Sequence, residues 1–136
     1  MRYILYLFLA ISVLSCKNEN SLKDNLEIDK IKVYYFPFDI TPPVGLSEEG
    51  MRDSESISIT KIKNIQEVKM ELLNLEKLKN PYQFSDTSIH LLCDFYYKDK
   101  LMFTLLHDTN YFVIEDNIYE NNKVLIELLI EDFKLD

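Results

Sequence analysis

Apolar and polar residues alternate along two stretches of the chain, 28–38 and 55–63. A period of two puts successive side chains on opposite faces of an extended backbone, so each stretch predicts a β-strand. In the second stretch the alternation slips at Ile62, which indicates a bulge or a turn. Residues 37–54 contain three of the four prolines and both glycines. We therefore expect a long loop without regular structure between the two strands.

The segment that follows has the spacing of an amphipathic helix. Asn64 can act as its N-cap, with Glu67 three residues later in position to reach back to the cap. Asn80 and Pro81 predict its end, after two lysines that suit the negative end of the helix. The apolar positions that define this helix are Ile65, Val68, Leu72, Leu75 and Leu78.

Residues 88–119 predict a meander of short strands. Turn-forming residues interrupt an apolar alternation at 98–100, 107–110 and 116–117. Strands joined by such short turns must be antiparallel. The last segment, 123–133, has a helical stripe of apolar residues and an asparagine at 121 or 122 to cap it.

These patterns together predict one α+β domain over residues 28–136. We expect an antiparallel sheet of about five strands, with two helices on one face and the order β-β-α-β-β-β-α, leaving room for one extra short strand. The chain has no internal repeat and no low-complexity tract. Its length is enough for a single modest core and not for a second domain.

The register of the hairpin that contains both histidines decides where they lie. A two-residue turn would pair position i with 197 − i and place His90 opposite His107, which could begin a metal site. A three-residue turn would pair i with 198 − i and place Cys93 opposite Leu105 on one apolar face. Burial of one face selects register strongly, so we expect the second arrangement, with the histidines on opposite faces. No third ligand is evident, and we expect neither a metal nor a cofactor.

Cys93 alternates with apolar neighbours, which predicts a buried structural cysteine. A nucleophilic thiolate would need exposure and a cationic neighbour. His90 lies an odd number of positions away, so on a strand it points to the opposite face and cannot pair with this thiol. Two glycines are too few for a glycine-rich phosphate loop, and no serine, threonine or lysine lies in a nucleophile motif. We therefore expect a protein that is not an enzyme.

The first sixteen residues have the organisation of an export signal. Arg2 is followed by an apolar run over 3–14, then by Ser15 and Cys16. Twelve helical residues span roughly 18 Å, well short of a hydrocarbon core of about 30 Å, so the run is not a permanent membrane span. The segment Val13-Leu14-Ser15-Cys16 resembles the lipobox of bacterial lipoproteins.

That resemblance implies removal of residues 1–15 as a signal peptide and attachment of lipid to Cys16. Residues 16–27 would then form a polar tether that holds the folded domain at a membrane. No aspartate follows the cysteine, a pattern similar to that of lipoproteins sent to the outer membrane or cell surface, although the inner membrane stays open. The body also resembles small, uncharacterised α+β lipoproteins of Gram-negative bacteria, a likeness without signature residues that implies no activity.

Charge narrows the class of partner. After residue 15, the chain has 14 basic and 23 acidic residues, a net charge of −9. Such a surface repels nucleic acid, and it disfavours docking on anionic lipid through charge alone. A basic or neutral protein partner is compatible with it, and solubility alone would also account for it.

Candidate partner-binding residues come from the first strand and the loop after it. Aromatic side chains beside a proline-bearing loop are typical of protein-binding patches, and the sequence leaves open whether that face is covered or exposed. The candidates are the aromatics Tyr34, Phe36 and Phe38 and the acids Glu48, Glu49 and Asp53. We expect a membrane-anchored binding protein, in one version an immunity or inhibitor protein against a cationic target. The alternative is a small hydrolase or a small-ligand carrier with its site between sheet and helices.

Overall fold

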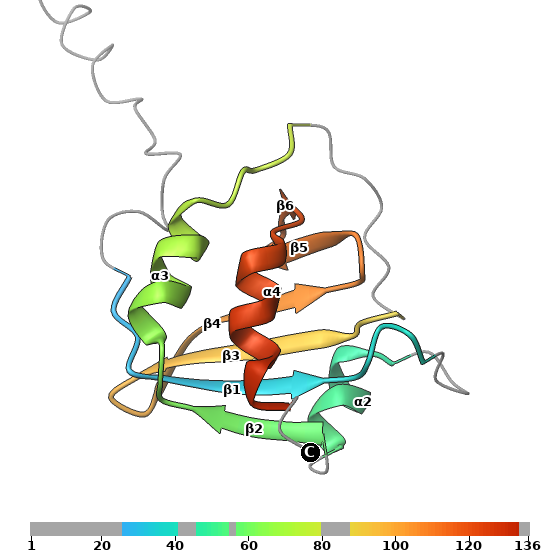
Figure 1. Ribbon diagram of the computed structural model, residues 1–136, viewed down its shortest axis with the longest axis horizontal. Helices are drawn as coiled ribbons and strands as arrows, with labels where there is room; N and C mark the ends of the chain where they lie inside the picture. Colours follow the sequence, from blue (N-terminus) through green and yellow to red (C-terminus); the bar gives the residue numbers. More distant parts are fainter. Residues whose placement is uncertain (1–25, 41–45, 55–56, 80–87, 134–136) are drawn as a thin grey trace, which may run out of the picture.

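The protein forms one six-stranded antiparallel sheet with helices on both faces (Figure 1). The computed structural model describes residues 26–40, 46–54, 57–79 and 88–133. The sheet order is β2-β1-β3-β4-β5-β6. The strands are β1 (Lys30–Tyr35), β2 (Ser58–Lys61), β3 (Leu91–Tyr97), β4 (Lys100–His107), β5 (Tyr111–Ile114) and β6 (Asn117–Glu120). The α+β class and the antiparallel sheet are thus confirmed, with β6 as the extra short strand.

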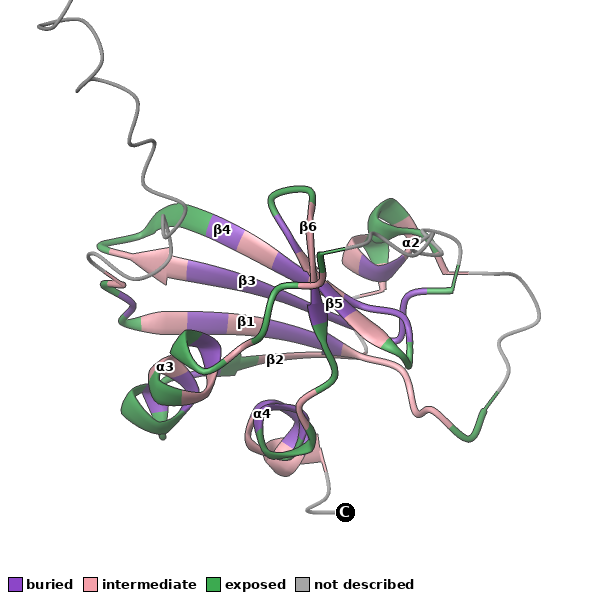
Figure 2. Ribbon diagram, turned by 90° about the horizontal axis from the view of Figure 1, so that it is seen from above, coloured by how far each residue is buried: buried purple, intermediate pink, exposed green. Residues whose placement is uncertain are grey.

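Helices α3 (Ile65–Leu73) and α4 (Lys123–Ile130) cover one face of the sheet, which we call the inner face (Figure 2). A single turn of 3-10 helix, η2 (Glu131–Phe133), continues α4. Alternate residues of the strands and the apolar stripes of both helices form the main core there. Its fully buried strand residues include Ile31, Leu91, Cys93, Phe95, Leu105 and Phe112. No helix among the described residues is long and apolar enough to cross a membrane.

The opposite, outer face carries a helix that the sequence did not predict. The expectation of a loop without regular structure over 37–54 is wrong, because α2 (Glu48–Asp53) lies within it. The hydroxyl oxygen of Ser47 accepts a hydrogen bond from the Gly50 N–H (3.2 Å) and caps this helix. Met51 is fully buried against the second core cluster, formed with Tyr34, Ile89 and Leu92. Six residues present one apolar position, too few for a detectable helical period.

Helix α3 is shorter than predicted. It ends at Leu73, and Glu76 and Leu78 instead form backbone hydrogen bonds with β6, from Leu78 N–H to Ile118 O and from Glu120 N–H to Glu76 O (both 2.9 Å). Asn64 occupies the N-cap position as predicted, but it has a left-handed φ of 53° and its side chain makes no cap hydrogen bond. Pairing with β6 therefore satisfies the backbone hydrogen-bonding groups after Leu73, in a segment that the apolar spacing alone predicted to be helical.

The β3–β4 hairpin has the two-residue turn of one alternative and, in most of its length, the strand register of the other. Lys98 and Asp99 form a two-residue turn with φ values of 49° and 63°, typical of type I′, so the predicted three-residue turn is wrong. A bulge at Met102 then shifts the pairing, and Cys93 lies opposite Leu105 as expected. Burial selected the register in the body of the sheet, whereas the turn followed its own local preference.

The last helix begins as predicted. The Asn122 side-chain oxygen accepts a hydrogen bond from the Leu125 N–H (3.0 Å), which caps α4. The same side chain donates to Glu71 (2.8 Å) and so joins α4 to α3. At the far end, the buried ammonium of Lys61 on β2 forms ion pairs with Glu131 and Asp132 of η2. The Lys61 hydrogen bond lowers the pKa of Glu131.

Candidate functional site

The three candidate aromatics do not form one exposed patch. Tyr34 is buried beneath α2, and Phe36 packs half-buried against the same cluster on the outer face. Phe38 packs against the core of the inner face, with its ring 5.5 Å from Tyr35 and 5.4 Å from His90. The face carrying Tyr34 and Phe36 is therefore covered, which settles the question that the sequence left open.

An ion-pair network holds α2 against the outer face. Arg52 pairs with the buried carboxylate of Asp94 on β3, and it also donates to Glu48 (2.9 Å) and Thr104 (3.2 Å). Thr104 donates in turn to the second oxygen of Asp94 (2.7 Å). Partial burial lowers the pKa of Arg52, but the hydrogen bonds to Asp94 and Glu48 outweigh it and raise the pKa above its usual range. The network fixes the position of Glu48 at the edge of α2.

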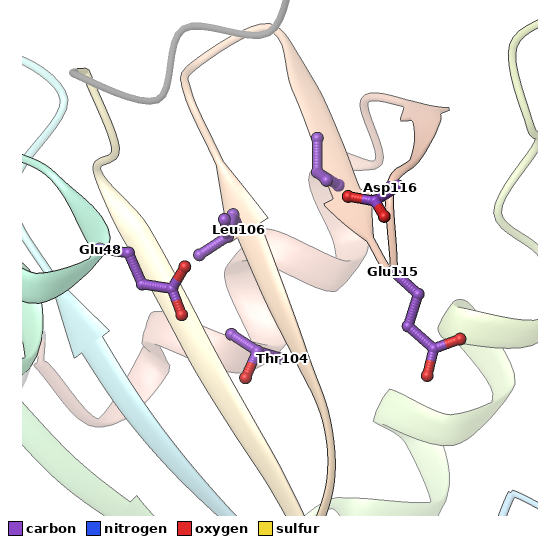
Figure 3. A pocket seen from close by; sticks show the side chains of 6 residues that line it. Glu48, Thr104, Leu106, Glu115 and Asp116 are labelled. Carbon is purple, nitrogen blue, oxygen red and sulfur yellow. The ribbon is translucent and has the colours of Figure 1, made fainter.

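A shallow groove of about 260 Å³ opens beside this network. Figure 3 shows Glu48 on one side of it and the acidic β5–β6 turn on the other, with Thr104 and Leu106 between them. Leu106 and Val113 supply an apolar floor. Glu115 and Asp116 occupy the turn with φ values of 47° and 64°, so two acids take positions where Asn-Gly is more usual. We call this feature the acidic groove, lined by Glu48, Thr104, Leu106, Val113, Glu115 and Asp116.

The acidic groove is complementary to a cation with an aliphatic stem. Three carboxylates line it, and Arg52 pairs with one of them, so the remaining charge is negative. A lysine or arginine side chain can lay its methylenes on the apolar floor while its charged head meets the carboxylates. All three carboxylates are exposed, whereas a catalytic acid needs burial to stay protonated near neutral pH. The arrangement is therefore suited to binding.

The structure brings together only part of the set that the sequence proposed. Glu48 lines the acidic groove, whereas Glu49 and Asp53 are exposed on α2 outside its lining. Glu115 and Asp116 were missed because acids at a turn carry no signal beyond the turn itself. Cys16 lies outside the described residues.

The histidines and Cys93 each have a structural role. Burial raises the pKa of the Cys93 thiol well above its usual value, so the thiol is held neutral inside the core. His107 faces the inner side opposite Leu91, with Nε2 3.0 Å from Asn121 Oδ1 and Nδ1 accepting from the Thr109 N–H. His90 Nδ1 lies 3.2 Å from the Phe36 carbonyl. Among the described residues, no three His, Cys, Asp or Glu side chains are grouped as metal ligands would be.

A second, more open hollow of about 310 Å³ lies where α3, β6 and α4 meet. Its walls are polar and exposed, and they carry both signs of charge. The lining residues are Asn74, Leu75, Glu76, Glu120, Asn121, Asn122 and Lys123. This hollow corresponds to the site between sheet and helices that the alternative function requires.

No protein-family model, no curated protein and no solved structure matches this chain.

Proposed function

We propose that this protein is a lipid-anchored, non-enzymatic binding protein of the cell envelope, at the outer membrane or cell surface, and that it recognises a cationic segment of a protein partner. The lipobox-like segment ending at Cys16 supports the anchor. The net negative charge of the mature chain argues against nucleic acid as the partner. An immunity or inhibitor protein against a basic target is the specific version that these features favour.

The observation that carries the proposal is the acidic groove. It combines carboxylates from α2 and from the β5–β6 turn over an apolar floor, so one basic side chain can satisfy both its charge and its methylenes. Thr104, Leu106 and Val113 of the groove lie on strands, and the ion pair between Arg52 and Asp94 holds in place the helix that carries Glu48. A helix that is already held in place does not have to be ordered when a partner binds, which lowers the cost of binding.

A second candidate is a small-ligand carrier. The hollow between α3, β6 and α4 supports it, since its acids, amides and Lys123 could bind a small polar molecule with charges of both signs. Mutations at Glu120 and Lys123 would then abolish binding of that molecule and leave the acidic groove unaffected. A hydrolase has weaker support, because the carboxylates of both hollows are exposed.

Titration with defined cationic probes tests the groove directly. We expect N-acetyl-lysine amide and N-acetyl-arginine amide to shift the NMR signals of Leu106 and Val113. Glu115→Gln/Asp116→Asn should weaken binding by roughly twofold for each carboxylate, at about 0.5 kcal/mol per exposed pair. Glu67→Gln/Glu127→Gln removes the same charge from exposed helix positions and is the matched control.

Crosslinking in the native host tests for a protein partner. A photo-crosslinking residue in place of Val113, on the groove floor, should capture a product whose yield the Glu115→Gln/Asp116→Asn change lowers. The same residue in place of Val124, exposed on α4, is the control. Identical products from both positions would refute the groove as the binding site. Mass spectrometry of the same protein tests the anchor, since an unmodified Cys16 would refute it.

A further inference from the structure

Three exposed apolar side chains lie at one end of the sheet, which we call the hairpin end. It comprises the turn between β3 and β4, the start of β1 and the residues that follow β2. The pairings Lys30 with Tyr96 and Ile31 with Lys61 bring these segments together (Figure 1). The exposed fractions of its apolar side chains are 70% for Ile62, 46% for Leu101 and 42% for Met102.

Lysines and tyrosines lie at the same end. The ammonium of Lys30 lies 5.1 Å from the centre of the Tyr96 ring, and that of Lys98 lies 5.1 Å from the centre of the Tyr97 ring. Lys63 and Lys100 belong to the same end. Two acids of this end contact it directly, since Asp99 pairs with Lys30 (2.6 Å) and Asp29 accepts from the Lys98 N–H (2.8 Å). The hairpin end is thus rich in lysine although the whole chain is acidic.

The chain from Cys16 enters the domain at this same end. Ile28 is buried there, and the Asp29 N–H donates to the Tyr96 carbonyl (2.9 Å), so the entry point is fixed to β3. Leu26 is the tenth residue after Cys16, so the chain between them reaches at most about 35 Å. A lipid on Cys16 would therefore keep the entry point at the hairpin end within about 35 Å of the bilayer surface.

We infer that the hairpin end is a docking surface for an anionic lipid bilayer. Exposed aliphatic residues, tyrosines and lysines together are the composition that binds the interface between headgroups and acyl chains. The occupant is the bilayer because the tether already brings it to this end, so that weak contacts act at a high effective concentration. The inference rests on the proposed acylation of Cys16. It places α2 and the Ile40 end of the sheet away from the membrane.

A polarity-sensitive fluorophore on the acylated, full mature protein tests this inference. Leu101→Cys places the probe at the hairpin end, and Ile40→Cys places it at the opposite end, where the native side chain is 50% exposed against 46% for Leu101. Cys93 is buried and should not react. The protein is incorporated into vesicles of phosphatidylcholine alone or with phosphatidylglycerol. We expect a blue shift at position 101 and none at 40, larger with the anionic lipid.

A charge change tests the lysines. Lys98→Glu/Lys100→Glu should lower the ratio of docked to undocked protein in the anionic vesicles by at least about fivefold for each lysine. Lys79→Glu/Lys123→Glu, which makes the same change of net charge outside the hairpin end, should leave the ratio unchanged. Loss of the blue shift in the first variant but not in the second would support docking through the lysines.

Three results would overturn the inference. Equal spectra at positions 101 and 40 in protein that floats with the vesicles would show that the hairpin end does not contact lipid. A shift at 101 that depends on protein density at constant lipid would instead identify a second copy of the chain as the occupant. Protein that carries no lipid on Cys16 and does not float would refute the anchor itself, a failure distinct from the other two.

Discussion

The two faces of the sheet hold their helices by different interactions. On the inner face, α3 and α4 bury apolar stripes, and Leu125 and Leu129 are almost completely inaccessible to solvent. On the outer face, α2 is only six residues long and contributes one buried apolar side chain, Met51, together with the ion pair between Arg52 and Asp94. Apolar burial grows with helix length, so a short helix depends more on polar contacts for its position.

Buried charge also differs between the faces. In the ion pair of the outer face the buried member is an anion, Asp94, whose side chain is 2% exposed and whose cationic partner is Arg52. In the ion pairs of the inner face the buried member is a cation, Lys61, whose side chain is 1% exposed and whose partners are the partly exposed carboxylates of Glu131 and Asp132. Removing the exposed partner of a buried charge costs much more than replacing the buried charge itself. The two faces should therefore respond differently to similar mutations.

The largest effect should come from the apolar inner face. Leu129→Ala removes a side chain that is 1% exposed, and we expect a loss of about 4 kcal/mol in the free energy of unfolding, from lost burial and a residual cavity. Val124→Ala, on the exposed side of the same helix, should change it by less than about 0.5 kcal/mol. Urea denaturation measures both. Similar losses for the two variants would contradict the assigned orientation of α4.

A smaller effect should follow when the outer-face ion pair is broken. Arg52→Met leaves the buried Asp94 carboxylate without its cation. We expect a loss of about 2 kcal/mol, below the usual range for a buried pair because Arg52 is one-third exposed. Amide hydrogen exchange should accelerate in α2 and not in α4. The double change Arg52→Met/Asp94→Leu should recover much of the loss, and a double variant as unstable as the single one would contradict this explanation.

Stability should also depend on pH through His107. Burial lowers the pKa of this imidazole in the folded protein, and the unfolded chain has a value near 6.5. The unfolded state therefore binds more protons as the pH falls below that value, and the free energy of unfolding decreases toward lower pH. Above about pH 6.5 this contribution is fully present. Thermal melting between about pH 7 and pH 5 should show the decrease, and His107→Gln should remove part of it.

Retention of the full pH dependence in His107→Gln would contradict the assignment to this residue. His90→Gln is the control, because it changes the other imidazole and leaves the hydrogen bonds of His107 with Asn121 and Thr109 in place.

The smallest effect should come from the buried lysine. Lys61→Met replaces the ammonium with an apolar group of similar length, and Glu131 and Asp132 are exposed enough to be hydrated without it. We expect a change of less than about 1 kcal/mol. Urea denaturation of this variant and of Arg52→Met under the same conditions compares their free energies of unfolding. A loss equal to that of Arg52→Met would contradict the expectation that replacing a buried charge costs less than removing its partner.

The sequence was most informative where burial acts on many residues at once. The register that pairs Cys93 with Leu105 followed from the need to bury one face, and the Asn122 cap followed from local hydrogen bonding. Helix α2 could not be found, because Met51 is its single buried apolar residue. The end of α3 was misplaced because Leu75 and Leu78 continue the helical spacing although the backbone there pairs with β6.

The acidic groove could not be predicted from the sequence for a different reason. Glu48, Leu106 and Glu115 are far apart in the sequence, and strand order together with α2 brings them to one place. Glu48 was proposed as part of an acidic loop, but its position is fixed by Arg52, whose partner Asp94 lies on another element. Local patterns carry no information on such a pairing.

The pairing of Glu76 and Leu78 with β6 affects how easily the sheet could pair with the sheet of another copy. By pairing with β6, it covers one margin of the sheet, where unpaired amides would otherwise invite another chain. The opposite margin is the four-residue β2, which turns a charged lysine inward and is too short to support extended pairing. Many copies could therefore share a small area without fusing their sheets into aggregates.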